Sequence, residues 1–375
     1  MRHPILICAI IALAAALGAQ ETKVSQHPNG TQAGVSAFRY VADPVACPPG
    51  DDMATIPPVE SRRLVCDLVE SPLMSKAVEE WVDMAVAGTL TLNKEDVFVT
   101  YLEMCRENHG PPHFGHYNGN DMQFASGIAR LFYGTALYWR LQQTGTPMSK
   151  SLFDDTFAML NKGDAQATSR IVDYLTKTES GDELGGRALA QFAKRRDFAN
   201  MFFICCVGFE NFNVNQKIWP TTPSPRDLQL LGEKLPLNYE NSNRVTTNQV
   251  AALLYLIDQE GIVSRCASRR IKDMLYRPVE QAKVAPLPGI AAGLPVGSKI
   301  WSLNGYTVRN YHDAAIVSLP NGKHYILVAF TKYPKDYPTD FIPKLSEIVA
   351  NRLMQSTGDN DRTGDYLYAR PLTGR

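Results

Sequence analysis

The stretch that decides the fold of this 375-residue chain reads Phe124-Ala125-Ser126-Gly127-Ile128-Ala129-Arg130-Leu131. Apolar side chains continue after it at helical spacing, through Phe132 and Leu137 to Trp139. A helix that is apolar on most of its surface is suited to burial. We therefore expect a helix at the centre of a domain, with Ser126 in its first turn.

The segments on either side of this helix carry helical and strand patterns. Ser71-Pro72 offers an N-cap and a first-turn proline, and predicts a helix that stops at Gly88. The Gly/Pro/His-rich residues 109–121 read as a loop. Further helices are expected at 164–176, 247–259, 264–276 and 341–353. Strands are expected at 97–104, 300–307, 313–320 and 324–331, the last two joined at Asn321-Gly322.

This order of elements predicts an α+β fold, with an antiparallel sheet flanked by helices and a helical subdomain. We expect one domain over residues 71–355, with a helical insert at about 126–280. Residues 20–70 are Pro-rich and polar, and predict a partly disordered N-terminal extension. Residues 356–375 read as a polar tail.

The first 19 residues have the layout of a secretory signal peptide, with Arg2, an apolar run from Ile5 to Leu17, and small residues after it. No later segment is apolar for the ~20 residues that span a bilayer. We expect a secreted or periplasmic protein that does not insert in the membrane once the signal is removed.

Six cysteines remain in the mature chain, in a compartment where disulfides can persist: Cys47, Cys66, Cys105, Cys205, Cys206 and Cys266. Cys47 with Cys66 is the most plausible local bridge, whereas Cys205 and Cys206 lie in an apolar run and read as buried thiols.

Acidic and basic residues balance at 38 each, which gives no electrostatic case for nucleic acid. The expected partner is a small molecule or a peptide, and no cofactor is expected. His109, His113 and His116 have no carboxylate or cysteine at ligand spacing, so we predict no metal site.

Four stretches carry a resemblance to one known family. They are 116–126, which ends at Ser126; Gly163-Asp164-Ala165-Gln166-Ala167-Thr168; 213–219 with 240–247; and 301–317, which contains Leu303-Asn304-Gly305. In this order they resemble the class A β-lactamase and penicillin-binding-protein superfamily, more closely its uncharacterised bacterial serine hydrolase branch. The resemblance implies acyl transfer by a serine, with Ser-x-x-Lys, Ser-Asp-Asn and Lys-Thr-Gly elements to activate and position it.

The chain departs from each of these elements. Placing Ser126 as the nucleophile puts Ala129 where the resemblance requires lysine, and no Ser-x-x-Lys occurs anywhere in the chain. Arg130 stays protonated and cannot serve as the base. Gly163 and Ala165 replace the serine and asparagine of the second element, and Leu303 replaces the strand lysine.

The candidate catalytic residues are therefore Ser126 and Asp164, and the candidate binding residues are Asn304, Gly305, Lys299 and Glu240. Each has a second interpretation. Ser126 is also a small residue that lets a buried helix pack closely, and Asp164 is also a helix N-cap. Lys299 replaces the strand lysine only after a register shift. Glu240, like Glu233, lies in the region of the deacylating glutamate but also reads as a solvated loop carboxylate.

Two functions follow from these residues. The first is an exported, catalytically degenerate β-lactamase-like homologue that binds a peptide or a cell-wall-like ligand. The second is an active serine hydrolase of β-lactamase, peptidase or esterase type that uses Ser126 with a non-standard base. We expect Ala129 to face the inside of the cleft between the Ser126 helix and the strand near Gly305.

Overall fold

The structure is a computed structural model, and it describes residues 65, 67–89, 92–104, 112–219, 222–232, 241–283, 288–332 and 340–355. The predicted signal peptide, most of the extension, the polar tail and the proposed Cys47–Cys66 bridge lie outside these residues. Cys266 lies inside them and is disulfide-bonded.

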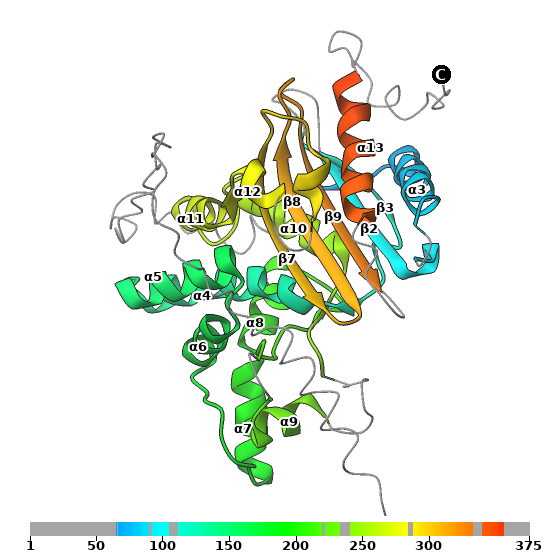
Figure 1. The fold of residues 1–375 in the computed structure, drawn as a ribbon. Coiled ribbons are helices and arrows are strands. Elements are labelled where there is room, and N and C mark those ends of the chain that lie inside the picture. The colour runs from blue at the N-terminus through cyan, green and yellow to red at the C-terminus, as the bar shows by residue number, and fades with distance from the viewer. Residues whose placement is uncertain are drawn as a thin grey trace, which may run out of the picture.

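A seven-stranded sheet forms the centre of the described part of the chain, in the order β1-β3-β2-β9-β8-β7-β6 (Figure 1). Its strands are β1 (Val69–Glu70), β2 (Val97–Glu103), β3 (His113–Tyr117), β6 (Tyr276–Arg277), β7 (Lys299–Thr307), β8 (Asn310–Ser318) and β9 (His324–Lys332). Neighbouring strands run antiparallel except β1 and β3, which are parallel. The predicted α+β class is confirmed, and the parallel edge pair makes the sheet mixed.

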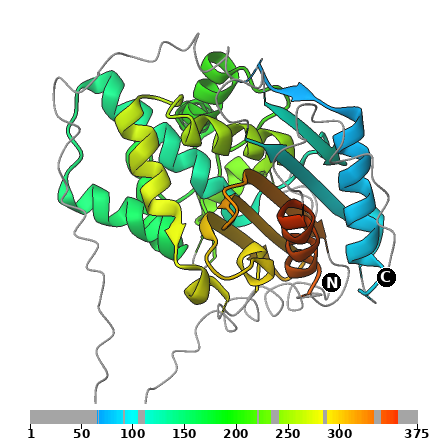
Figure 2. The same ribbon diagram turned by 90° about the horizontal axis from the view of Figure 1, so that it is seen from above.

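One face of the sheet is covered by α3 (Pro72–Val86), α13 (Phe341–Gln355) and the short η5 (Ile290–Gly293) (Figure 2). The α3 helix begins as its sequence predicts, because the Ser71 hydroxyl accepts a hydrogen bond from Met74 N at 3.3 Å. Its buried stripe, from Met74 through Trp81 to Ala85, packs into a core shared with α13 and the sheet.

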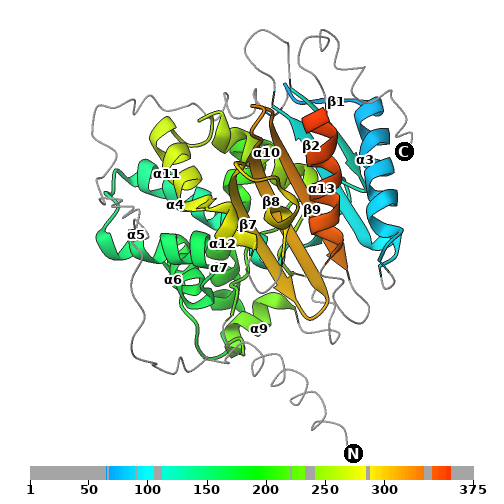
Figure 3. The ribbon, with the colours of Figure 1, turned by 45° about the horizontal axis from the view of Figure 1, so that its top comes forward.

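The opposite face packs on α10 (Thr247–Asp258) and on the short 3₁₀ turn that precedes α4 (Ala129–Thr144). Figure 3 shows α4 and its neighbours grouped beyond β7, as the predicted helical subdomain. Its helices are α5 (Lys150–Phe157), η3 (Ala158–Lys162), α6 (Ala165–Thr176), α7 (Gly186–Arg196), α8 (Phe198–Met201), η4 (Phe202–Val207), α9 (Pro225–Leu231) and α11 (Arg265–Leu275). The short α12 (Val279–Lys283) instead packs against η5 and shares the core of α3 and α13. The small elements η1 (Lys94–Asp96), β4 (Gln123–Phe124), η2 (Ser126–Ile128) and β5 (Arg244–Val245) complete the fold.

The α4 helix is the predicted central helix, with Leu131, Phe132 and Leu137 fully buried. It begins with a 3₁₀ turn, η2, which contacts β7 and β8. Because the turn touches the sheet and the helix runs away from it, residues 126–130 lie where the two subdomains join.

The predicted loop at 109–121 is wrong in its described part, because β3 runs through it and pairs with both β1 and β2. Gly115 explains how a strand fits there, since a Cβ on it would lie 2.7 Å from Met74 O in α3. Loop-like composition here reflects close packing of backbone on backbone, which favours glycine.

Cys205 and Cys206 are also placed differently from the prediction. Cys205 is exposed and Cys206 is half-buried, whereas Phe202 and Phe203 point into the core. These residues form the π-helical η4, whose wider turn decides which side chains face inward.

Candidate functional site

The η2 turn and strand β7 meet at two glycines. A Cβ on Gly305 would overlap the amide nitrogen of Gly127 and lie 2.7 Å from its Cα. Only glycine fits where two backbones approach so closely. The structure therefore brings Gly305 against the turn that contains Ser126, as the resemblance requires.

Ser126 opens η2 in the left-handed backbone region, with φ 48°. A residue with a Cβ adopts this conformation at a cost of about 1–2 kcal/mol. Ser126 is only 6% exposed, and its hydroxyl forms no hydrogen bond within the described part of the chain. Ala129 is fully buried in the apolar core. The expectation that Ala129 faces the inside of the cleft is wrong, because the first turn of α4 directs it into that core.

Arg130, one residue further along, supplies the cation at this turn. A Cβ on Gly127 would overlap Nη2 of Arg130, and a Cβ on Gly163 would overlap Nη1. The guanidinium thus lies between the two glycines and fills the space that side chains at positions 127 and 163 would need.

The sequence contains a signal for this arrangement, but the signal does not include a serine. Shifting the Ser-x-x-Lys template by one residue pairs Gly127 with Arg130, and Gly163 begins the second element. A glycine at the first position has no nucleophilic atom, so the sequence alone does not mark position 127 as part of a site. Contact among positions 127, 130 and 163 becomes visible only in three dimensions.

Arg130 is deeply buried and keeps its charge near neutral pH. It is 8% exposed. Burial lowers the pKa of its guanidinium to about 10, and the charge of Arg277 adds to this effect, while Tyr306 and Asp164 oppose it. A group with a pKa near 10 is protonated at pH 7 and cannot accept a proton from a serine.

Asp164 serves as the N-cap of α6. Its Oδ1 accepts a hydrogen bond from Ala167 N at 2.7 Å, and its carbonyl oxygen accepts one from Thr168 Oγ1 at 2.6 Å. Gly163 before it ends η3 in the left-handed region, with φ 71°. The geometry agrees with the interpretation of Asp164 as a helix cap.

The remaining candidates are not all brought together. Asn304 pairs with Asp313 beside Gly305, and Leu303 is buried in the core. Lys299 is exposed at the start of β7, six residues from Gly305 and therefore about 20 Å along the strand. The structure does not place Lys299 at the turn. Glu240 and Glu233 lie outside the described residues.

His312 pairs with Gly305 across β7 and β8 and fixes the segment before Ser126. Its Nδ1 accepts a hydrogen bond from Thr331 N at 3.3 Å, so its Nε2 carries the proton and donates to Phe124 O at 2.8 Å. Burial lowers the pKa of His312 to about 4, although the Phe124 carbonyl opposes the shift. Sequence reasoning missed this residue.

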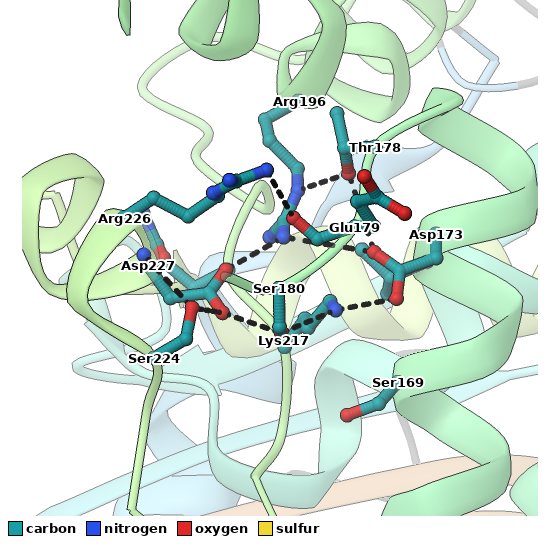
Figure 4. Close-up of polar contacts among 12 residues, drawn as sticks. Ser169, Asp173, Thr178, Glu179, Ser180, Arg196, Lys217, Ser224, Arg226 and Asp227 are labelled. Atoms are coloured by element: carbon teal, nitrogen blue, oxygen red, sulfur yellow. Dashed lines mark hydrogen bonds and ion pairs between the residues drawn. The ribbon is translucent and has the colours of Figure 1, made fainter. Parts of the chain in front are cut away.

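A second polar cluster lies in the helical subdomain (Figure 4). Arg196 is fully buried and donates to Asp227 at 2.6 Å, and Lys217, 3% exposed, pairs with Asp173. Ser180 links the pairs, since it donates to Asp227 and accepts from Lys217. Burial alone would raise the pKa of Asp227, but the Ser224 hydroxyl and the Arg196 charge lower it.

This cluster positions residues 213–219, the third stretch of the resemblance. Lys217 fixes one end, and Asn243 fixes the middle through hydrogen bonds from Asn215 N at 2.9 Å and Gln216 N at 2.8 Å. The cluster holds a loop against α6, α7 and α9, and its charges are used in mutual pairing.

The described residues contain no group of three or more side chains suited to hold a metal ion. His113 is exposed, and His116 contacts Glu70 at 3.4 Å and accepts from Gly119 N at 3.1 Å. His109 lies outside the described residues. Among the helices described, none is long and apolar enough to cross a bilayer.

Residues 198–353 match the model of the β-lactamase enzyme family. The match covers the 213–219 loop, β7 to β9 and most of α13, and begins after the turn at Ser126. With the fold, it shows that the chain is similar to the β-lactamase and penicillin-binding-protein-like serine hydrolases. No curated protein sequence matches the chain.

Solved structures share the fold at low sequence identity. A mutant of PBP-A, solved as its acyl-enzyme complex with penicillin G, is 16% identical with a TM-score of 0.51, covering 75% of this chain and 97% of its own. The TLA-1 extended-spectrum β-lactamase is 12% identical with a TM-score of 0.55, covering 75% of this chain and 100% of its own. The β-lactamase of Sphaerobacter thermophilus DSM 20745 is 14% identical with a TM-score of 0.52, covering 75% of this chain and 98% of its own. These identities show a shared fold only.

Proposed function

We propose that this protein is an exported, catalytically degenerate β-lactamase-like homologue that binds a peptide or a cell-wall-like ligand. One observation carries the proposal. The Arg130 guanidinium fills the space beside Gly127 and Gly163, where the superfamily's elements would place two serine side chains. An arginine that stays protonated supplies neither a nucleophile nor a general base.

The register of the first element supports the same conclusion. Gly127 and Arg130 occupy the positions that face each other and face Gly163, and Gly127 has no hydroxyl. Ser126 is the neighbouring hydroxyl, but the residue three positions on is the buried Ala129. Neither register provides a serine with a lysine one turn away.

A peptide partner fits the free edge of β7. Strand β6 pairs only with Ile300 and Trp301, so among the described residues no strand pairs with residues 302–307 on that edge. Unpaired backbone groups on a strand edge can accept an extended peptide as an additional strand. Export rests on the signal-like residues 1–19.

The rival function, a serine hydrolase that uses Ser126 with another base, has one observation in its favour. The positive φ of Ser126 is a strained conformation of the kind found at functional sites. We consider the strain a consequence of the turn that seats Gly127 on Gly305.

Covalent labelling by a fluorescent penicillin and turnover of a chromogenic cephalosporin test the proposal. The mature wild-type protein and its Ser126→Ala variant should show equal, background-level signals in both assays, next to an active class A β-lactamase as positive control. Labelling or turnover that Ser126→Ala removes would establish the serine hydrolase instead.

A further inference from the structure

The Arg130 guanidinium has no partner within the described chain. Its five N–H groups form no hydrogen bond or ion pair with a described residue, and its Nε is fully enclosed without an acceptor. A buried charge in this situation is costly unless an opposite charge pairs with it. Most buried charges in this fold are paired, as Arg196 is with Asp227.

Arg277 adds a second cation with the same property. It is half-buried on β6, its Nε has no hydrogen-bond partner, and its charge lowers the pKa of Arg130. The β6 strand is held next to Gly163, because Asn161 in η3 donates to Tyr276 O at 3.3 Å and Met274 O at 3.0 Å. Two unpartnered guanidinium groups therefore act on the same region.

The carboxylates that act on these arginines are already engaged. Asp164 caps α6 through its Oδ1. Asp313 accepts hydrogen bonds from Ile290 N at 2.7 Å and Ala314 N at 2.9 Å. Neither forms an ion pair with Arg130 or Arg277 in the described part of the chain.

We propose that Arg130, assisted by Arg277, is the anchor for a carboxylate group of the ligand, which binds against the Arg130 guanidinium at the η2 turn. This inference rests on the proposed function, since it gives a chemical class to the ligand of the degenerate site. Leu303 replaces the strand lysine, so the chain has no cation at that position of β7. The structure supplies the cation from the α4 helix, at a position where an acyl-transfer enzyme needs a base.

The guanidinium group suits this role because its planar fork matches the two oxygens of a carboxylate. A ligand carboxylate would meet a charge that burial has already desolvated, so the ion pair forms in surroundings where it is strong. The rest of an extended peptide ligand would then continue along the free edge of β7, past Gly305.

The test compares N-acetyl-dialanine with its C-terminal carboxamide, which has the same shape without the charge. Binding is measured by titration calorimetry, and the melting temperature is measured in acetate against chloride at equal ionic strength. For the wild type, the acid should bind about tenfold or more tighter than the amide, and acetate should raise the melting temperature.

Three variants locate the effect. Arg130→Met should remove the preference for the acid and the acetate effect, and Arg130→Lys should keep a reduced preference because it keeps the charge without the fork. Arg187→Met removes an exposed arginine on α7 and should leave both unchanged. If Arg130→Met does not fold, Arg277→Met and Arg130→Lys still report a weakened preference.

Equal affinity for acid and amide in the wild type, or an acetate effect that survives in all variants, would overturn the carboxylate anchor. The same holds if neither peptide binds and acetate has no effect. None of these results changes the penicillin-labelling assay, so a failure of the anchor is distinguishable from a failure of the proposed function.

Discussion

At the scale of single residues, one arginine decides what the turn before α4 can do. Its guanidinium needs the room that glycine leaves at positions 127 and 163, and those are the positions where hydroxyl groups would serve acyl transfer. Cation and glycines therefore form one steric unit, and restoring a single serine would not restore the chemistry.

This steric unit can be measured with a double-mutant cycle. Gly127→Ala places a Cβ against Nη2 of Arg130 and 2.8 Å from Asn304 O. We expect it to lower the free energy of unfolding by about 1–3 kcal/mol, as overpacking does. Gly127→Ala combined with Arg130→Met should cost less than the sum of the single changes, because the contact with the guanidinium is gone.

Urea denaturation of the four proteins of this cycle measures the coupling, with Gly186→Ala as the matched control. Gly186 has open space around its Cβ position, so its change should alter stability little. Strict additivity of Gly127→Ala and Arg130→Met would contradict the placement of the guanidinium beside Gly127.

His312 should make stability depend on pH. Its pKa in the folded state, about 4, lies below the ordinary value of 6.5, so folding favours the neutral ring. The contribution is fully present above pH 6.5 and is lost as the pH falls towards 4, because the unfolded chain takes up the proton first.

Comparing the wild type with His312→Gln isolates this effect, since glutamine can donate and accept but does not titrate. Between pH 7 and 4.5, the wild type should lose on the order of 2 kcal/mol more unfolding free energy than the variant. Parallel losses in urea denaturation at the two pH values would rule out a neutral buried His312.

At the scale of elements, strand β7 has two roles. It contacts the η2 turn, and beyond Trp301 one of its edges pairs with no strand in the described part of the chain. Gly305→Ala should therefore lower the melting temperature by several degrees, since its Cβ would overlap the Gly127 amide. Lys299→Ala, at the exposed start of the same strand, should leave it unchanged. Thermal unfolding followed by circular dichroism measures both melting temperatures. An equal decrease in the two variants would contradict the contact between Gly305 and Gly127.

The elements also show which patterns can be interpreted from the chain. The α3 helix begins at its predicted cap, Ser71, and the predicted helix at 247–259 begins after Thr246. In both helices the capping side chain accepts a hydrogen bond from the backbone three residues on. The β3 strand could not be predicted in this way. It is held by pairing with β2 on one side and, on the other, with β1, which is only two residues long and distant in sequence.

At the scale of the whole molecule, a buried ion pair between Arg196 and Asp227 stabilises the helical subdomain. Asp227→Asn should destabilise the fold by about 3–5 kcal/mol, because it removes the carboxylate at 2.6 Å from the fully buried Arg196 and leaves only Asp173, at 3.8 Å. Asp155→Asn breaks the more exposed pair with Arg170 and should cost at most about 1 kcal/mol. Similar unfolding free energies for the two variants, measured in urea, would show that the buried pair does not stabilise this subdomain more than the exposed pair does.

The sequence by itself determined the α+β class, the central buried helix, the strands β7 to β9 and the absence of a Ser-x-x-Lys motif. These follow from periodicity, caps and spacing, which are local properties of the chain. Only the tertiary structure decided which residue faces which at the turn. The left-handed Ser126 and the 3₁₀ turn rotate Ala129 into the core and bring Arg130 between Gly127 and Gly163. That rotation depends on the contact of η2 with β7, about 180 residues away in sequence, and a contact of that separation is set by packing rather than by local pattern.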